Sequence, residues 1–178
     1  MKDTDIAYIA GLLDGEGYIQ YIKAICKADG YKRYRFGVSI ASTDREIINW
    51  LKEVIPQHGR VEVKHPKNGR FDIYHLRWYG DNARQVLELC LPYMRIKRPQ
   101  AELYLAMRTL TDWAITKGTF GKPQYPIWVR QVQDIVVEEF KKLHHTRGFK
   151  YTPLESLLEV QAATAPGLCL EAPKRCSL

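Results

Sequence analysis

The first half of the chain contains two pairs of segments in which apolar and polar residues alternate, and a turn signal joins the segments of each pair. In residues 32–42, aromatic and β-branched side chains alternate with polar ones, which predicts a strand with one buried and one polar face. Residues 18–27 are rich in Tyr and Ile and predict its partner, across the turn signal at residues 28–30. Residues 60–64 and 71–79 alternate in the same way on either side of an Asn-Gly pair, which predicts a second hairpin.

Segments with apolar residues at helical spacing lie before, between and after the two hairpins. The order helix-hairpin-helix-hairpin-helix, without strand-helix-strand alternation, predicts an α+β fold with an antiparallel sheet of four strands. We expect one domain over residues 1–160 and a flexible tail over residues 161–178, where Ala, Pro and Gly accumulate. The expected helices cover residues 5–15 with Asp5 as a cap, 81–91, 99–117, 127–144 and 153–160, and a further helix that Thr43 or Asp44 caps and that ends at about residue 55.

Charge and composition narrow the functional class. The 178 residues include 27 Lys and Arg against 20 Asp and Glu, a net charge of +7, which favours an acidic partner such as nucleic acid. No apolar run approaches the roughly 20 residues needed to cross a bilayer, and the first residues lack an apolar signal core, so we expect neither a membrane partner nor secretion. The four cysteines form no CxxC pair and predict free thiols rather than a zinc site.

Strand alternation collects polar side chains on one face of the predicted sheet. An antiparallel sheet of this kind matches the major groove of DNA, where Arg, Gln and Glu can bind base edges. The alternative is an ordinary solvated face. Lys23 and Lys27 have the opposite phase from Gln20, so either a bulge intervenes or one set is peripheral. The candidate DNA-binding residues are Gln20, Arg33, Arg35, Ser39, Arg60, Glu62, Lys64, His75 and Arg77.

The first predicted helix is unusually rich in small residues. Gly11 and Gly15 are four residues apart, so they share one face and admit the close approach of a second backbone. Glu16 follows at the helix end. If two such helices pack together, two Glu16 carboxylates meet, an arrangement that suits divalent metals and phosphodiester hydrolysis. The alternative is that Asp14 and Glu16 only serve a turn.

Residues 9–17, Ile-Ala-Gly-Leu-Leu-Asp-Gly-Glu-Gly, resemble the LAGLIDADG motif of the homing endonucleases. Residues 92–101, Pro-Tyr-Met-Arg-Ile-Lys-Arg-Pro-Gln-Ala, are similar to a segment of the family's single-motif members. The resemblance covers residues 5–160 and implies an αββαββα core with a saddle-shaped DNA-binding sheet. Because the chain has one motif, it also implies a homodimer that cuts a long pseudo-palindromic site in double-stranded DNA.

The resemblance also implies roles for individual residues. Glu16, with the Gly15 carbonyl, matches the ligand set for Mg²⁺ or another divalent cation, and Lys97 matches the lysine that stabilises developing negative charge. Ser42 stands where the family often has a Gln that positions water, and Arg45 is the candidate for a second basic residue near the cut. The implied dimer interface comprises Ala10, Gly11, Asp14 and Gly15, and the implied phosphate contacts are Arg147 and Lys150.

The function implied is a site-specific, Mg²⁺-dependent double-strand DNA endonuclease of intron homing. Two alternatives stay open: an RNA maturase that uses the same fold in intron splicing, and a catalytically silent DNA-binding domain. The family's distribution implies an intracellular protein of an organelle, either chloroplast or mitochondrion, or of the bacterial cytoplasm.

Overall fold

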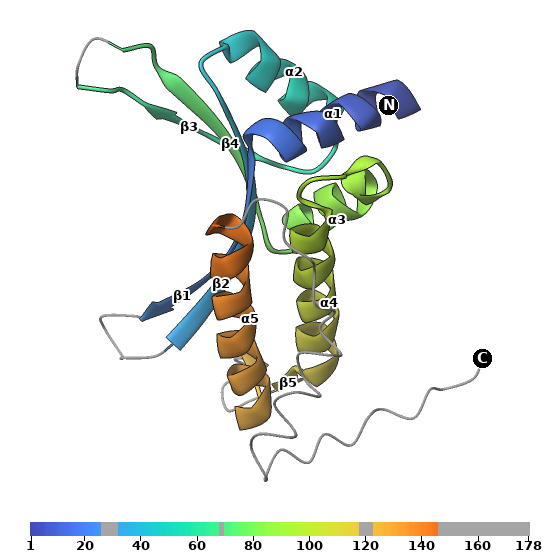
Figure 1. The fold of residues 1–178 in the computed structure, drawn as a ribbon, viewed down its shortest axis with the longest axis vertical. Helices are drawn as coiled ribbons and strands as arrows, with labels where there is room; N and C mark the ends of the chain where they lie inside the picture. The colour runs from blue at the N-terminus through green and yellow to red at the C-terminus, as the bar shows by residue number, and fades with distance from the viewer. Residues whose placement is uncertain (26–31, 68–69, 118–122, 146–178) are drawn as a thin grey trace.

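The computed structural model of the chain describes residues 1–25, 32–67, 70–117 and 123–145. The α+β class is confirmed (Figure 1). The predicted helix at 153–160, the turn at 28–30 and the boundary between domain and tail at 160–161 lie outside these residues. The main elements are α1 (Asp3–Glu16), β1 (Gly17–Ile25), β2 (Lys32–Ser42), α2 (Arg45–Val54), β3 (Arg60–Lys64), β4 (Ile73–Tyr79), α3 (Gly80–Cys90), α4 (Arg98–Ala114) and α5 (Ile127–His145).

The four predicted strands form one antiparallel sheet in the order β1-β2-β4-β3. β1 pairs with β2 in an unbroken register from Gly17 opposite Ile40 to Ile25 opposite Lys32, so no bulge interrupts β1. The described helices lie on one side of the sheet, and the two hairpins splay apart as they lead away from the helical layer (Figure 1). The sheet is therefore curved, with its outer face turned away from the helices.

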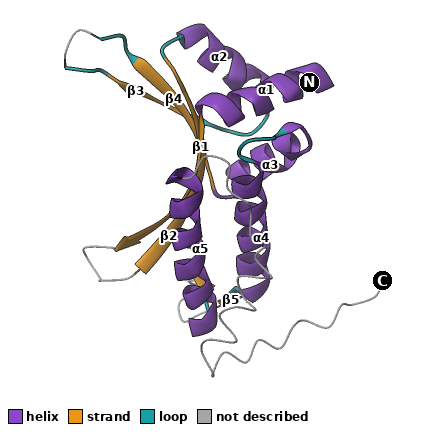
Figure 2. Cartoon of the chain, in the orientation of Figure 1, coloured by secondary structure: helices purple, strands orange, loops and turns teal. Residues whose placement is uncertain are grey.

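Strands and helices form two layers (Figure 2), and the residues of the hydrophobic core come from both. Alternate strand residues such as Ile19, Ile40 and Trp78 are fully buried, because successive side chains of a strand point to opposite faces. From α1, Ile9 and Leu13 are fully buried against them, four residues apart on one helix face. The buried face of α1 thus fixes which of its residues remain at the surface.

Several element boundaries differ from the sequence prediction. α1 begins two residues early, at Asp3, and Asp5 caps it from inside the first turn, where its carboxylate accepts a 2.9 Å hydrogen bond from the backbone N–H of Lys2. α4 ends at Ala114 instead of residue 117, since Thr116–Lys117 (β5) pairs with Pro123–Gln124 (β6). A 3-10 turn, Leu91–Tyr93, follows α3.

Gly17, where α1 passes directly into β1, has no room for a side chain. An added Cβ would collide with the Leu13 carbonyl oxygen, which belongs to rigid helix backbone. We expect Gly17→Ala to lower the free energy of unfolding by about 1–3 kcal/mol, the usual cost of overpacking. Urea denaturation measures this change.

Gly37→Ala is the matched control for that measurement. A Cβ at Gly37 would meet the Gln20 Nε2 atom at 2.7 Å and the Tyr79 ring at 3.2 Å. Both are ends of side chains that can move aside, so the loss should be smaller than at Gly17. Equal losses for the two variants would contradict the explanation.

Candidate nucleic-acid interface and active site

α1 presents an open face of small residues opposite its buried face. Gly11 and Gly15 are exposed, and a Cβ built on either would meet no atom within 4 Å. Ala10, in contrast, is fully buried in the core of its own protomer. The prediction that Ala10 lies at a dimer interface is therefore wrong, because this residue has no surface to offer a partner.

Asp14 binds its own chain. Its Oδ2 atom accepts hydrogen bonds from the backbone N–H groups of Arg95 and Ile96 at 2.7 and 3.1 Å. Its Oδ1 atom accepts a third from the N–H of Lys97 at 2.9 Å. Both carboxylate oxygens thus serve the loop before α4, and the place at a dimer interface that the resemblance implied for Asp14 stays a prediction.

Lys97 lies at the C-terminal end of α1, next to the motif. Its ammonium group donates to the backbone carbonyl oxygens of Leu13, Asp14 and Gly15 at 2.9, 2.8 and 3.3 Å. Partial burial lowers the pKa of Lys97, while the nearby Asp14 and Glu16 carboxylates act in the opposite direction. The structure therefore brings Lys97 next to Gly15 and Glu16, which come about 80 residues earlier in the sequence.

The oxygen atoms at this helix end suit a divalent cation. Glu16 is exposed and offers a carboxylate, and the Gly15 carbonyl is beside it. Among residues 1–25, 32–67, 70–117 and 123–145, no group of three or more His, Cys, Asp or Glu side chains could hold a metal. Glu16 and Gly15 offer one carboxylate and one carbonyl, and Mg²⁺ commonly takes one or two carboxylates and completes its shell with phosphates and water.

Ser42 and Arg45 lie where β2 leads into α2. Ser42 is two residues beyond Ile40, the partner of Gly17, so it lies at the same end of β1 as Glu16. Its Oγ atom accepts a 3.0 Å hydrogen bond from the backbone N–H of Asp44, the residue that caps α2. Arg45 is the exposed first residue of that helix. Ser42 therefore stabilises this turn, whatever other role it has.

All nine candidate DNA-binding residues lie on the outer face of the sheet. The strand registers place them in rows that share this face, such as Ser39, Arg77 and Arg60, or His75 and Glu62. The question of phase in β1 is also settled: Lys23 lies on the inner face, where its Nζ atom is 2.6 Å from Asp134 of α5. Lys27 lies outside the described residues, as do Arg147 and Lys150.

Sequence analysis missed the aromatic and aliphatic residues of the same face. Tyr18, Ile22 and Tyr79 are 46%, 41% and 42% exposed and share the phase of the predicted polar residues. Extending the alternation by one step, from Gln20 to Tyr18 and from Arg77 to Tyr79, is the signal that identifies them. The outer face thus offers apolar contacts as well as charge.

Glu62 and Arg77 form an ion pair on this face, with a separation of 3.1 Å between Oε2 and Nη1. Arg60 lies 3.7 Å from the other Glu62 oxygen. Glu62 is a candidate for contacts with base edges, but in the protein alone it holds Arg77. Arg77 is central in the sheet, whereas Arg35 lies beyond the last β2–β4 pair, Gly37–Tyr79.

His75 lies among these charges. Burial lowers the pKa of His75, as do the positive charges of Lys64 and Arg77, and Glu62 only partly opposes them. Below the ordinary histidine pKa of about 6.5, the unfolded chain binds the proton more readily than the folded protein. The stabilisation that neutral His75 provides should therefore decline as pH falls from that value through the lowered pKa.

We expect His75→Gln to reduce this acid sensitivity, because the variant has no proton to take up at this position. The measurement compares urea denaturation near neutral pH and at about pH 5.5. His58→Gln, at an exposed histidine, is the control. If His75→Gln loses stability on acidification as steeply as wild type, His75 is not responsible.

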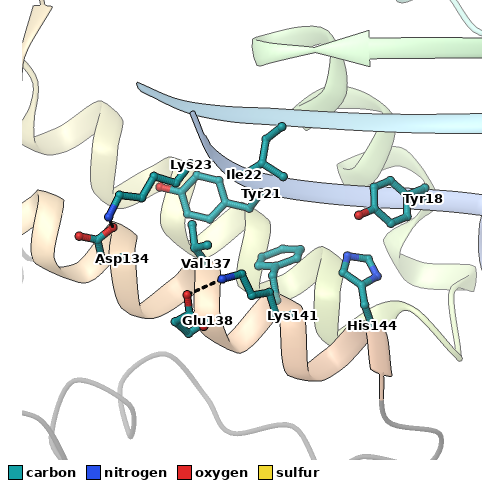
Figure 3. Close-up of a pocket in the computed structure, with 10 residues that line it drawn as sticks. Tyr18, Tyr21, Ile22, Lys23, Asp134, Val137, Glu138, Lys141 and His144 are labelled. Atoms are coloured by element: carbon teal, nitrogen blue, oxygen red, sulfur yellow. Dashed lines mark hydrogen bonds and ion pairs between the residues drawn. The ribbon is translucent and has the colours of Figure 1, made fainter. Parts of the chain in front are cut away.

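A groove of about 520 Å³ separates α5 from the edge strand β1 (Figure 3). Its charged groups are paired across or along it, Lys23 with Asp134 and Lys141 with Glu138 at 2.6 Å each. The rings of Tyr18 and His144 stack at its other end, 4.6 Å apart. These contacts attach α5 to the edge of the sheet.

No protein-family model and no curated protein sequence matches the chain. Several solved structures do match the chain. I-CvuI in complex with its target has a TM-score of 0.59 at 18% identity, over 88% of this chain and 91% of that one. The archaeal intron-encoded I-Vdi141I complexed with DNA has a TM-score of 0.63 at 17% identity, over 90% and 96%. The LAGLIDADG homing endonuclease I-GzeII in complex with a DNA target has 0.58 at 13%, over 84% and 52%. At these identities the likeness establishes a shared fold.

None of the helices in the described ranges is both long and apolar enough to cross a membrane.

Proposed function

We propose that this chain, which has the fold of the LAGLIDADG homing endonucleases, is a site-specific double-strand DNA endonuclease that acts as a homodimer with a divalent cation. The observation that carries the proposal is that the Lys97 ammonium binds the carbonyl oxygens at the end of α1, within the electrostatic reach of Glu16, where that helix passes into β1. A carboxylate and an ammonium group at one point are the groups that phosphodiester hydrolysis uses.

The outer face of the sheet supports DNA as the substrate. Its predicted contacts include Arg33, Arg35, Arg60, Lys64 and Arg77, and only Glu62 carries negative charge. Arg and Lys neutralise phosphates, and Arg can also bind guanine through two hydrogen bonds in the major groove. The similar structures of I-CvuI, I-Vdi141I and I-GzeII contain DNA, which supports the same class of partner here.

The open face of α1 supports a dimer. Nothing in the described protomer fills the space over Gly11 and Gly15, and each protomer supplies one Glu16. The match covers 96% of I-Vdi141I but only 52% of I-GzeII, so this chain corresponds to about half of the longer protein. Pairing two copies along α1 would bring two Glu16 carboxylates together and place one curved sheet on each half of a two-fold symmetric site.

Each residue of the site has a distinct part in this mechanism. Glu16 and the Gly15 carbonyl would hold a divalent cation, which supplies an activated water and neutralises phosphate charge when bound. The Lys97 ammonium, next to Glu16, would stabilise the negative charge that develops on the scissile phosphate. Ser42, at the same end of the sheet, is the proposed group that orients water, and Arg45 is the proposed second cation near the cut.

Selection from a randomised DNA library with the purified protein and Mg²⁺ tests the function directly. We expect one long, approximately palindromic sequence to be recovered as cut molecules, and no cutting when the cation is chelated. A protein that promotes splicing of an intron-containing RNA but leaves every DNA uncut would support the maturase alternative. A protein that binds DNA without cutting it would be the silent DNA-binding domain.

Arg35 gives a finer test of how the sheet contacts DNA. It lies five positions along β2 from Ile40, the partner of Gly17 next to Glu16. At about 3.3 Å per residue this is roughly 17 Å, or about five base pairs further out in each half-site. We expect Arg35→Ala to lose about 1–3 kcal/mol of discrimination at one symmetric pair of positions. Binding to a panel of single-base site variants at two salt concentrations measures it.

Lys52→Ala is the control for this experiment, because it removes a positive charge from the exposed side of α2. It should leave sequence preference unchanged. If Arg35→Ala weakens binding to every site variant by the same factor, Arg35 contacts only phosphates and the base-contact assignment fails. The Lys150→Ala variant of the predicted phosphate contact should change salt sensitivity alone, lowering the salt slope by about one unit.

A further inference from the structure

The loop between the 3-10 turn and α4 is attached to α1 through one side chain. Met94, at its start, is buried, but Ile96 in its middle is 75% exposed, so apolar packing holds little of this loop. Its backbone N–H groups at positions 95, 96 and 97 all donate to the Asp14 carboxylate. Lys97 is also the residue that precedes α4, and its carbonyl accepts the bond from Ala101 N–H that opens the helix.

Asp14 and Lys97 therefore bind each other twice. The Asp14 side chain holds the backbone of Lys97, and the Asp14 backbone carbonyl accepts a 2.8 Å hydrogen bond from the Lys97 ammonium. A lysine side chain has four flexible carbon–carbon bonds, so the place of its ammonium depends on how firmly its backbone is held. Backbone and side chain of Lys97 are both fixed to the helix end that carries Glu16.

We propose that Asp14 is a positioning residue for Lys97: it holds the 95–97 loop so that the ammonium stays beside Glu16. This inference rests on the nuclease function proposed above, in which Lys97 acts on the phosphate. It gives the two acidic residues of the motif separate tasks. Glu16 is exposed and available to a cation, whereas both oxygens of Asp14 are already occupied by backbone N–H groups.

Asp14→Asn is the informative substitution, because the amide keeps the shape of the side chain but replaces one acceptor oxygen with a donor. It cannot accept all three bonds, so the loop and Lys97 should shift. A displacement of about 1 Å in a catalytic group can slow a reaction about 100-fold, and we expect a loss of this order in single-turnover cleavage. The affinity for DNA, measured without cleavage, should be unchanged.

A double-mutant cycle distinguishes positioning from general structural damage. If Asp14 acts through Lys97, Asp14→Asn should cause no further slowing in a protein that already carries Lys97→Met. Slowing by the full factor in both backgrounds would overturn the proposal, as would an Asp14→Asn protein that cuts at the wild-type rate. Asp5→Asn is the matched control: it alters a carboxylate at the other end of α1 that also accepts a backbone N–H, and it should cut normally.

Amide hydrogen exchange tests the hydrogen bonds between Asp14 and the 95–97 loop without any cleavage assay. In the wild-type protein the N–H groups of Arg95, Ile96 and Lys97 should be protected although the loop is exposed, and Asp14→Asn should remove the protection. Unprotected wild-type amides would overturn the proposal even if the variant fails to fold. If wild-type protein cuts no DNA, the nuclease assignment fails, while amide exchange still reports whether Asp14 holds the 95–97 loop.

Discussion

Glu16→Gln is expected to abolish DNA cleavage while DNA binding persists. The amide has nearly the same size as the carboxylate but no negative charge, so it is a poor ligand for Mg²⁺. Glu16 is exposed at the end of α1 and contributes no buried contact to the core, so the fold should not change. We expect a fall in cleavage rate of at least about 100- to 1,000-fold, the scale of losing one group that stabilises charge in the transition state.

The measurement pairs single-turnover cleavage with DNA binding at low divalent-cation concentration. Removing two like charges from the symmetric site should leave affinity unchanged or raise it, since the DNA backbone is also negative. Glu53→Gln, at an exposed position of α2, is the matched control and should cut normally. Near-normal cutting by purified Glu16→Gln would remove Glu16 from the active site.

Hydrophobic alternation predicted the two faces of the sheet because a strand leaves few choices. Once Val38, Ile40 and Leu76 are buried, their neighbours must lie on the outer face. The unbroken register of β1 then places Gln20 and Lys23 on opposite faces, which the sequence alone left open. Short strands are different: β5 and β6 pair over two residues each, and such a pair has no pattern of its own to be recognised.

The misassignment of Ala10 shows that small residues in α1 do not by themselves identify the helix face at an interface. Successive residues of a helix are about 100° apart, so Ala10 is about 100° from Gly11 but only about 60° from the buried Leu13. Residue size alone suggested an interface, whereas helical phase places Ala10 in the core. The same phase leaves Gly11 and Gly15 together on the open side.

The contact between Asp14 and the 95–97 loop could not be found from local patterns. It joins residues more than 80 positions apart, and nothing in the spacing of either segment specifies the other. The resemblance marked both segments, 9–17 and 92–101, but assigned Asp14 to a dimer interface. Side-chain geometry was needed to show that its carboxylate holds the lysine loop, because an Asp at a helix end can cap a turn, face a partner or bind backbone N–H groups elsewhere.

Gly11→Leu is expected to separate the proposed homodimer and with it abolish double-strand cleavage. In the protomer, a Cβ atom at this position meets no atom within 4 Å, and replacing Gly in a helix gains up to about 1 kcal/mol of helix propensity. The protomer should therefore fold normally by circular dichroism. In the proposed dimer, two α1 backbones touch, and the Leu side chain overpacks this interface at each of two symmetric positions. Each position should lower the free energy of dimerisation by about 1–3 kcal/mol or more.

Sedimentation at micromolar concentration measures the loss of the dimer, and a cleavage assay measures the loss of double-strand cutting. Lys52→Leu is the control, since it adds the same bulk to an exposed position of α2 and should leave both assembly and cutting unchanged. Each protomer brings a single Glu16 and a single Lys97, so separated protomers lack the second carboxylate and the second sheet that a two-strand cut on a symmetric site requires. A wild-type protein that sediments as a monomer yet cuts both strands would show that one chain is sufficient, and the open face of α1 would then need another explanation.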